Sequence, residues 1–226
     1  MRKICTIRIS LILLATLAGV SCRNAPADKG PAPKPAAPGP PLVQPGAPGE
    51  PTRTITTEKA IDLSHVEFTP ADAKFMQGMI GHHSQALEMV ALLRTRSQRA
   101  DMQLLGKRID LSQADEIKMM QQWLRARGQP LPDPHAHHMA GATLMPGMLT
   151  AEEVDGLAKA KGAEFDRLFL QLMIKHHNGA LFMVEELLAT PGAAQESEIF
   201  AFTADIVADQ RMEIDRMGAM LREGQK

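Results

Sequence analysis

The sequence predicts an all-α protein, a four-helix bundle built from two duplicated helix pairs. Its 226 residues include no Tyr, only 4% aromatic residues and 15 Met, a composition that suits helices better than sheets. Apolar residues recur at intervals of three and four along several segments, which is the period of one helix face. The helical pattern then occurs a second time, and the repeat indicates two similar halves.

The N-terminal residues 1–22 are expected to be an export signal. A basic start precedes an apolar run of 12 residues at 9–20, which is too short to remain as a membrane anchor. The run ends in Gly-Val-Ser-Cys22 and resembles a bacterial lipoprotein cleavage site, although Gly19 stands where that pattern prefers Leu. We expect lipidation at Cys22, membrane contact through this anchor only, and a location in the bacterial cell envelope. Plain secretion is the alternative.

Residues 23–57 are expected to be a linker. Ten of the sixteen prolines fall between Asn24 and Pro51, and such a stretch behaves as a semi-extended spacer. The folded bundle is expected over 58–226. With Cys5 removed and Cys22 lipidated, this domain contains no thiol, so any metal chemistry there must use His, Met, Asp or Glu.

The first half reads as two helices. Thr69-Pro70 followed by Asp72 predicts an N-cap, a proline in the first turn and an acidic residue beside it. A second helix is expected over 100–127, where Gly128 and Pro130 are stop signals.

The second half reads as a short helix followed by two long ones. Thr150 and Glu153 form a capping box that opens the short helix. The long helices are expected at about 163–189 and 194–222.

The duplication is the strongest internal feature of the sequence. Residues 72–90 align with 166–184 at an offset of 94, and each segment carries a Met-x-x-His-His core. Residues 109–124 align with 206–221 at an offset of 97, because three extra residues fall near the Pro191-Gly192 turn.

The paired histidines lie on the apolar stripes of their helices. His82 falls near the middle of its stripe and His83 at the rim. If the halves pack around a pseudo-twofold axis, both pairs converge in the core with two glutamates. Imidazole, thioether and carboxylate ligands together favour copper, with Cu(I) preferred and other transition metals possible. The candidate ligands are Met79, His82, His83, Met89, Glu116, Met173, His176, His177, Met183 and Glu213. A structural network of hydrogen bonds from His to Glu116 and Glu213 is the open alternative.

A second cluster of His and Met lies between the halves, after several prolines, and is expected to be a loop. It either collects soft metal with modest affinity or is a solvated linker. Its members are His135, His137, His138, Met139, Met145 and Met148.

These motifs resemble those of the DUF305 family. Phe75–Met89 and Phe169–Met183 are similar to its signature, and the resemblance covers about 70–222. It implies a ferritin-like four-helix bundle and a relation to periplasmic copper-binding proteins of the CopM type. By similarity, the Met and His residues of the two segments would be the copper ligands. The ferritin motif Glu-x-x-His is missing, so the resemblance does not imply a di-iron oxidase.

We therefore expect an envelope protein that binds copper and buffers or delivers it. A net charge of −1 argues against nucleic acid as a partner, and we found no catalytic motif, so an enzyme is not expected. A structural or protein-interaction bundle without physiological metal is the alternative function. The Met-rich stripe also allows a homodimer.

Overall fold

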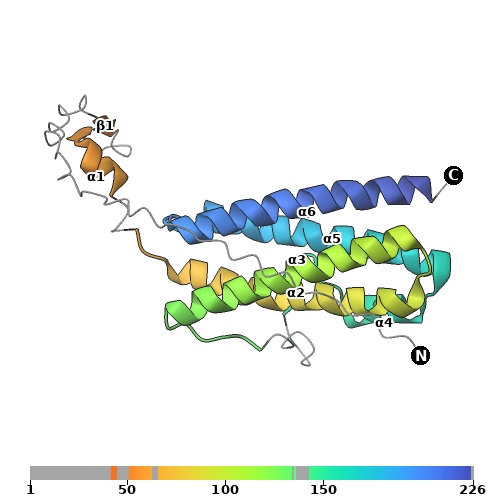
Figure 1. Cartoon of the computed structure of the whole chain (residues 1–226). Coiled ribbons are helices and arrows are strands. Elements are labelled where there is room, and N and C mark those ends of the chain that lie inside the picture. The colour runs from red at the N-terminus through yellow and green to blue at the C-terminus, as the bar shows by residue number, and fades with distance from the viewer. Residues whose placement is uncertain (1–41, 45–50, 63–65, 134, 136–142, 225–226) are drawn as a thin grey trace, which may run out of the picture. The chain divides into compact units, whose positions relative to one another are not determined.

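The computed structural model describes residues 42–44, 51–62, 66–133, 135 and 143–224 (Figure 1). The chain divides into two compact units, one ending at Ile61 and one beginning at Asp62. The expected export signal and Cys22 lie outside the described residues. No helix in the described part of the chain is long and apolar enough to cross a bilayer.

The first unit contains secondary structure where a spacer was expected. Strand β1 (Leu42–Gln44) pairs antiparallel with β2 (Arg53–Ile55), and Val43 lies opposite Thr54. Helix α1 (Thr57–Ile61) follows and buries none of its residues. Both strands are free of proline, which cannot donate to a strand ladder, so short pairing is possible inside a proline-rich stretch.

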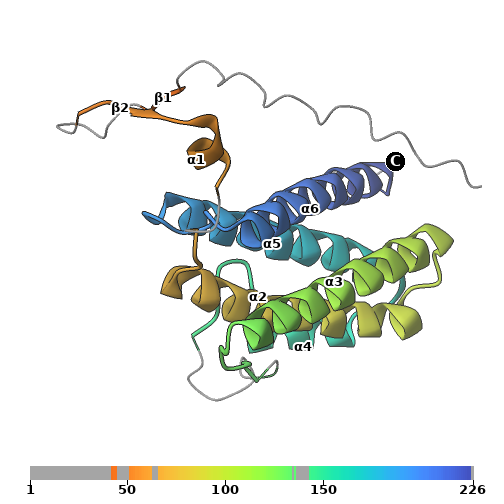
Figure 2. The ribbon, with the colours of Figure 1, turned by 60° about the vertical axis from the view of Figure 1, so that its left-hand side comes forward.

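The second unit is a four-helix bundle. Its long helices are α2 (Pro70–Arg96), α3 (Ala100–Ala126), α5 (Gly162–Ala189) and α6 (Ser197–Glu223). The short α4 (Ala151–Lys159) precedes α5. Helices α2 and α5 pack on each other, while α3 packs on α2 and α6 packs on α5 (Figures 1 and 2). The predicted all-α bundle of two helix pairs is confirmed.

The capping box predicted at Thr150 is present, and the N-cap predicted at Thr69 is part of a second one. The backbone N–H of Thr69 donates to Asp72 Oδ2 at 2.7 Å, and the Asp72 N–H donates back to Thr69 Oγ1 at 3.2 Å. Thr150 and Glu153 make the same reciprocal pair at the start of α4, at 2.9 and 3.3 Å. These bonds satisfy backbone donors that a helix leaves free at its first turn.

Helix α6 begins three residues later than the expected position 194. Ala194 has a φ of 54°, in the left-handed region, so it cannot be the first residue of a right-handed helix. Its N–H donates to the second carboxylate oxygen of buried Asp72 at 2.7 Å. The turn before α6 is thereby fixed to the N-terminus of α2.

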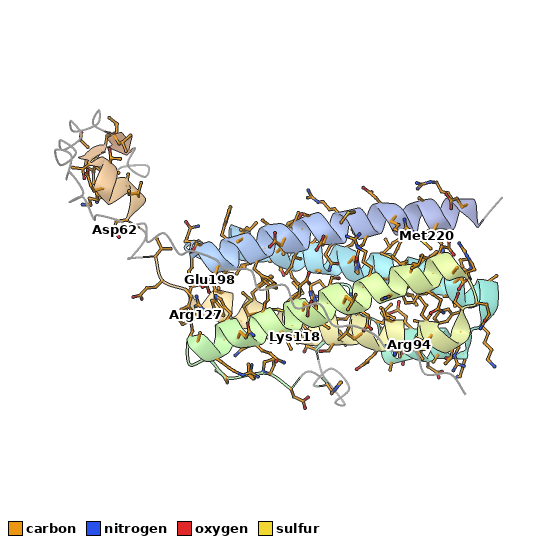
Figure 3. The ribbon with its side chains drawn as sticks, in the orientation of Figure 1. Asp62, Arg94, Lys118, Arg127, Glu198 and Met220 are labelled. Atoms are coloured by element: carbon orange, nitrogen blue, oxygen red, sulfur yellow. The ribbon has the colours of Figure 1, made fainter. Side chains whose placement is uncertain are left out.

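The end of α3 is tied to the beginning of α6. Arg127 lies 2.8 Å from Glu198 (Figure 3), and its guanidinium stacks over Trp123 at 4.3 Å from the ring centroid. Trp123 Nε1 donates to Glu196 at 3.0 Å, and Arg127 also pairs with Glu196. The outer helices are therefore joined at this end of the bundle by charge-assisted contacts.

The apolar core consists of two clusters separated along the helix axes. One contains residues 73–80 of α2 and 180–187 of α5, and the other contains residues 86–93 of α2 and 165–173 of α5. Helices α3 and α6 contribute to both clusters in the same way. A layer of polar residues, contributed by all of these long helices, lies between the two clusters along the chain.

Candidate metal centre in a buried polar layer

The polar layer contains matching residues from the two halves of the protein. Every member is at most 8% exposed, so the sequence buries a large set of polar atoms in the middle of an apolar bundle. Its members are His82, His83, Gln113, Glu116, His176, His177, Gln210 and Glu213. Burying such groups is unfavourable unless each one finds a partner, which makes their contacts informative.

One histidine of each pair bonds to a glutamate of its own half. His83 Nε2 pairs with Glu116, and His177 Nε2 donates to Glu213 Oε2 at 2.7 Å. The other carboxylate oxygen of Glu213 lies 3.4 Å from Arg108 Nε. These bonds link α2 to α3 and α5 to α6, and they fix the orientation of both imidazole rings.

The other two histidines meet where α2 and α5 pack together. The ring centroids of His82 and His176 are 3.8 Å apart, with the planes tilted by 39°. His82 Nε2 lies 3.0 Å from the carbonyl oxygen of Pro146. A carbonyl only accepts, so Nε2 must carry the hydrogen.

The loop that supplies this carbonyl is fixed on both central helices. The Gln85 side chain accepts from the Leu149 N–H at 2.7 Å and donates to the Leu149 carbonyl at 3.0 Å. Gly147, with a φ of 77°, lies directly against Gly179 of α5. A Cβ at Gly179 would lie 2.0 Å from the Pro146 oxygen, so only glycine permits this approach.

Burial keeps the central pair of imidazoles neutral. It lowers the pKa of His82 to about 3, and repulsion from His83 acts in the same direction, while the bond to Pro146 opposes them. The pKa of His176 is well below its usual value, first because of burial and then because of repulsion from His82 and His177. At neutral pH each ring therefore retains a nitrogen lone pair.

Several ring nitrogens of the layer have no hydrogen-bond partner. Among the described residues, Nδ1 of all four histidines and Nε2 of His176 are buried without a hydrogen-bond partner. The Oε1 atoms of Gln113 and Gln210, at equivalent positions of the duplication, are also unpartnered. The layer therefore has an excess of acceptors, an arrangement that a cation would satisfy.

The predicted methionines fall into different surroundings. Met79 and Met173 are fully buried and lie three residues before His82 and His176, on the same helix faces. Met89 packs in the cluster that contains Met173, whereas Met183 packs in the cluster that contains Met79. A thioether thus lies one turn from each central histidine, with Met79 in one apolar cluster and Met173 in the other.

The structure does not bring all of the predicted metal ligands together at one point. Within the described residues, no group of three or more His, Cys, Asp and Glu side chains could hold a metal ion. The reason is visible in the layer, where His83 and His177 turn toward their glutamates and only His82 and His176 face each other.

The second predicted cluster is also divided. His135 is exposed and lies 3.1 Å from Glu88, whereas Met148 is buried and Met145 is half-buried. His137, His138 and Met139 lie outside the described residues. The expectation of an exposed His and Met loop is therefore wrong for Met148, because Gln85 and Gly179 hold this end of the loop against the bundle.

Sequence reasoning missed Gln85, Pro146, Gly147 and Gly179 as residues that position the site. A signal was present, because Gln85 of the first half aligns with Gly179 of the second, which is one of the positions where the repeats differ. Gln85, whose side chain hydrogen-bonds the loop, and Gly179, which lets the loop approach α5, therefore stand at equivalent positions of the two halves.

The fold and the layer define an all-α bundle with a histidine-rich buried centre. The chain matches the family described as a domain of unknown function, DUF305, over residues 72–221, and it belongs to that family.

Solved structures share the fold. A DUF305 fragment from Deinococcus radiodurans is 35% identical, with a TM-score of 0.60, over 69% of this chain and 98% of that one. A DUF305 protein from Streptomyces coelicolor, described as secreted, is 28% identical with a TM-score of 0.60, over 69% and 94% of the two chains. CopM in a Cu(I)-bound form is 26% identical with a TM-score of 0.53, over 70% and 98%. CopM has also been solved with Cu(II) and with Ag. No curated protein matches the sequence.

Proposed function

We propose that this protein binds copper as cargo, preferentially Cu(I), at the meeting point of His82 and His176. The observation that carries the proposal is the buried, neutral pair of His82 and His176, each with a nitrogen lone pair that has no donor. Cu(I) is a soft cation that accepts imidazole and thioether ligands and does not need thiolate. Met79 and Met173 would supply the thioethers, because each lies one turn from a central histidine.

The histidine–glutamate bonds have a defined role in this proposal. His83 and His177 donate Nε2–H to carboxylates, and such outer contacts orient imidazoles in metal sites. Their Nδ1 atoms remain unpartnered and belong to the same layer.

The similarity to CopM supports this function, because that protein is solved with Cu(I), Cu(II) and Ag. Export is supported by the signal expected at residues 1–22 and by the neighbour described as secreted. We infer buffering or delivery outside the cytoplasm, by ligand exchange without turnover of a substrate. A lipid anchor at Cys22 belongs to the same proposal.

A competition titration of Cu(I) against a chromophoric chelator tests the proposal. It should use the full chain with Cys5→Ser and Cys22→Ser, so that no thiol competes for the metal. Replacing His82 and His176 by Ala should weaken binding by more than about a hundredfold, because changes outside the first ligand shell alone cost roughly 10–100-fold. Circular dichroism checks that the helices persist.

A His135→Ala variant is measured beside it and tests the second predicted cluster, since this histidine is exposed and outside the layer. Its affinity should equal that of the parent. Unchanged Cu(I) affinity in a folded His82→Ala/His176→Ala protein would refute the core site.

A second candidate function rests on a specific observation. Both halves use a His–Glu bond to join their two helices, which a purely structural or interaction bundle would also need. This alternative predicts that the unfolding temperature does not respond to copper. A clear rise at a modest Cu(I) concentration would count against it.

A further inference from the structure

A groove on the surface of the bundle brings two methionines from different parts of the chain together. It is lined by Met145 of the loop, Met183 of α5 and the α2 segment around Gly78. Met145 is partly exposed, whereas Met183 is almost fully buried. The pair therefore connects the solvent with the side of α5 that carries the layer.

Two glycines of α2 create the space that the methionines fill. A Cβ at Gly78 would lie 3.0 Å from Met145 Sδ and 3.5 Å from Met183 Cε. A Cβ at Gly81 would lie 3.4 Å from Met145 Cε. Met145 Sδ and Met183 Cε thus both lie beside the backbone of α2, one turn before His82.

This arrangement exists in only one half of the protein. The positions equivalent to Gly78 and Gly81 are Leu172 and Lys175 in the second half. Lys175 pairs with Glu153 of α4 at 2.7 Å. Met183 has a counterpart in Met89, so this half is distinguished by the space at the two glycines and by Met145 of the loop.

The groove is also connected to the candidate metal centre. Met145 directly precedes Pro146, whose carbonyl accepts the hydrogen bond from His82. An ion held by Met145 would lie beside the peptide group that orients this histidine.

We propose that Met145 and Met183 form a capture site for a soft monovalent ion, Cu(I), from which it passes to His82. The inference rests on the proposed function, because it assigns the route by which the core site is loaded. Two thioethers bind Cu(I) without charge neutralisation or proton loss, which suits a partly exposed site that must release its ion. Hydrophobic gap filling is the other role of such methionines, and leucine would serve it equally well.

The direct test follows the methionine methyl groups by NMR. The Cys5→Ser/Cys22→Ser protein, labelled at the methionine Cε and at the histidine ring carbons, is titrated with Ag⁺ as a stable substitute for Cu(I). The resonances of Met145 and Met183, assigned with Met→Leu variants, should shift before one equivalent is added. They should also shift in a His176→Ala variant, which leaves the His82–Pro146 bond in place.

The possible results separate this inference from the proposed function. Shifts of both methionines and of the core histidines support both. Shifts of the histidines alone overturn the capture site and leave the core site. Shifts of the methionines alone support the capture site and contradict the core site, and no shifts contradict both.

Loading kinetics give a second readout. Met145→Leu/Met183→Leu keeps the side-chain volume but removes both thioethers. Cu(I) transfer from a weak chelator should slow by about tenfold, the effect expected when one favourable contact with the ion is lost. Met119→Leu/Met212→Leu is the matched control, because both residues are exposed elsewhere on the bundle. Equal transfer rates in the two double variants would overturn the capture site.

Discussion

At the scale of single residues, the sequence predicted that the four paired histidines lie in the core, as they do, but it did not predict their different partners. His82 and His83 are adjacent and both fully buried, yet one faces His176 and the other faces Glu116. A helical wheel places a side chain on a face, but its partner depends on which neighbouring helix lies opposite. The sequence placed His83 at the rim of the apolar stripe, whereas the structure buries it fully and pairs it with Glu116.

The depressed pKa of His82 makes stability depend on pH. In the unfolded chain this histidine takes up a proton near pH 6.5, whereas the folded form does so only near pH 3. The contribution of His82 to the free energy of unfolding is thus fully present above pH 6.5, and it is lost progressively as the pH falls below that value. At pH 5 the loss from His82 alone should be about 2 kcal/mol.

Urea denaturation of the metal-free protein between pH 5 and 7 measures this effect. A His82→Gln variant retains a donor for Pro146 and should show a smaller decrease in stability toward pH 5. His135→Gln serves as the control and should follow the parent. An identical pH dependence in His82→Gln and parent would contradict the assignment.

The glutamates of the layer give a second residue-scale prediction. Glu116→Gln/Glu213→Gln preserves shape but removes the carboxylates that orient His83 and His177. Cu(I) affinity should fall roughly 10–100-fold, as for other outer contacts of metal sites, with unchanged helicity. Chelator competition measures it, and Glu164→Gln/Glu185→Gln, at two exposed positions, provides a control of equal charge change. Parent-like affinity in the double variant would leave the two bonds a structural role only.

At the scale of elements, helix positions followed from the sequence more closely than the loop did. The α3 and α6 helices, Ala100–Ala126 and Ser197–Glu223, correspond residue for residue at the offset of 97. Their periodicity and repetition are local signals. The loop around Pro146 has no period, and its position depends on the missing Cβ atoms of Gly147 and Gly179, which become meaningful only after α5 is in place.

Gly179→Ala tests whether the loop needs this close approach. An added methyl group would overlap Pro146 and displace the loop from α5, so stability should fall by about 1–3 kcal/mol despite the better helix propensity of alanine. Gly156→Ala in α4 is the matched control, because nothing lies within 4 Å of its added Cβ. That change should stabilise the protein by about 0.5–1 kcal/mol.

The midpoint of urea denaturation compares the two variants. The amide resonance of Leu149, whose N–H donates to Gln85, reports on the loop in each of them. Equal stability of Gly179→Ala and Gly156→Ala would show that the loop does not depend on this contact.

At the scale of the whole molecule, the polar layer divides what is otherwise a continuous apolar core. The two clusters on either side of it each draw residues from both halves of the duplication. Ligands from α2 and α5 therefore belong to different helix pairs, and an ion between His82 and His176 would join the halves. Metal binding and global stability are then linked, because the unfolded chain does not hold these histidines together.

The unfolding temperature should accordingly rise with free Cu(I). At a free concentration of about 100 times Kd, the folded state gains about 2.7 kcal/mol. For a protein of this size that corresponds to a rise of roughly 5–11 °C. Thermal scans of the Cys5→Ser/Cys22→Ser protein in chelator-buffered Cu(I) measure it. The His82→Ala/His176→Ala variant, scanned beside it, should show little or no rise. If both proteins gained the same stability, copper would bind outside the layer, and the junction between the two halves would not be its site.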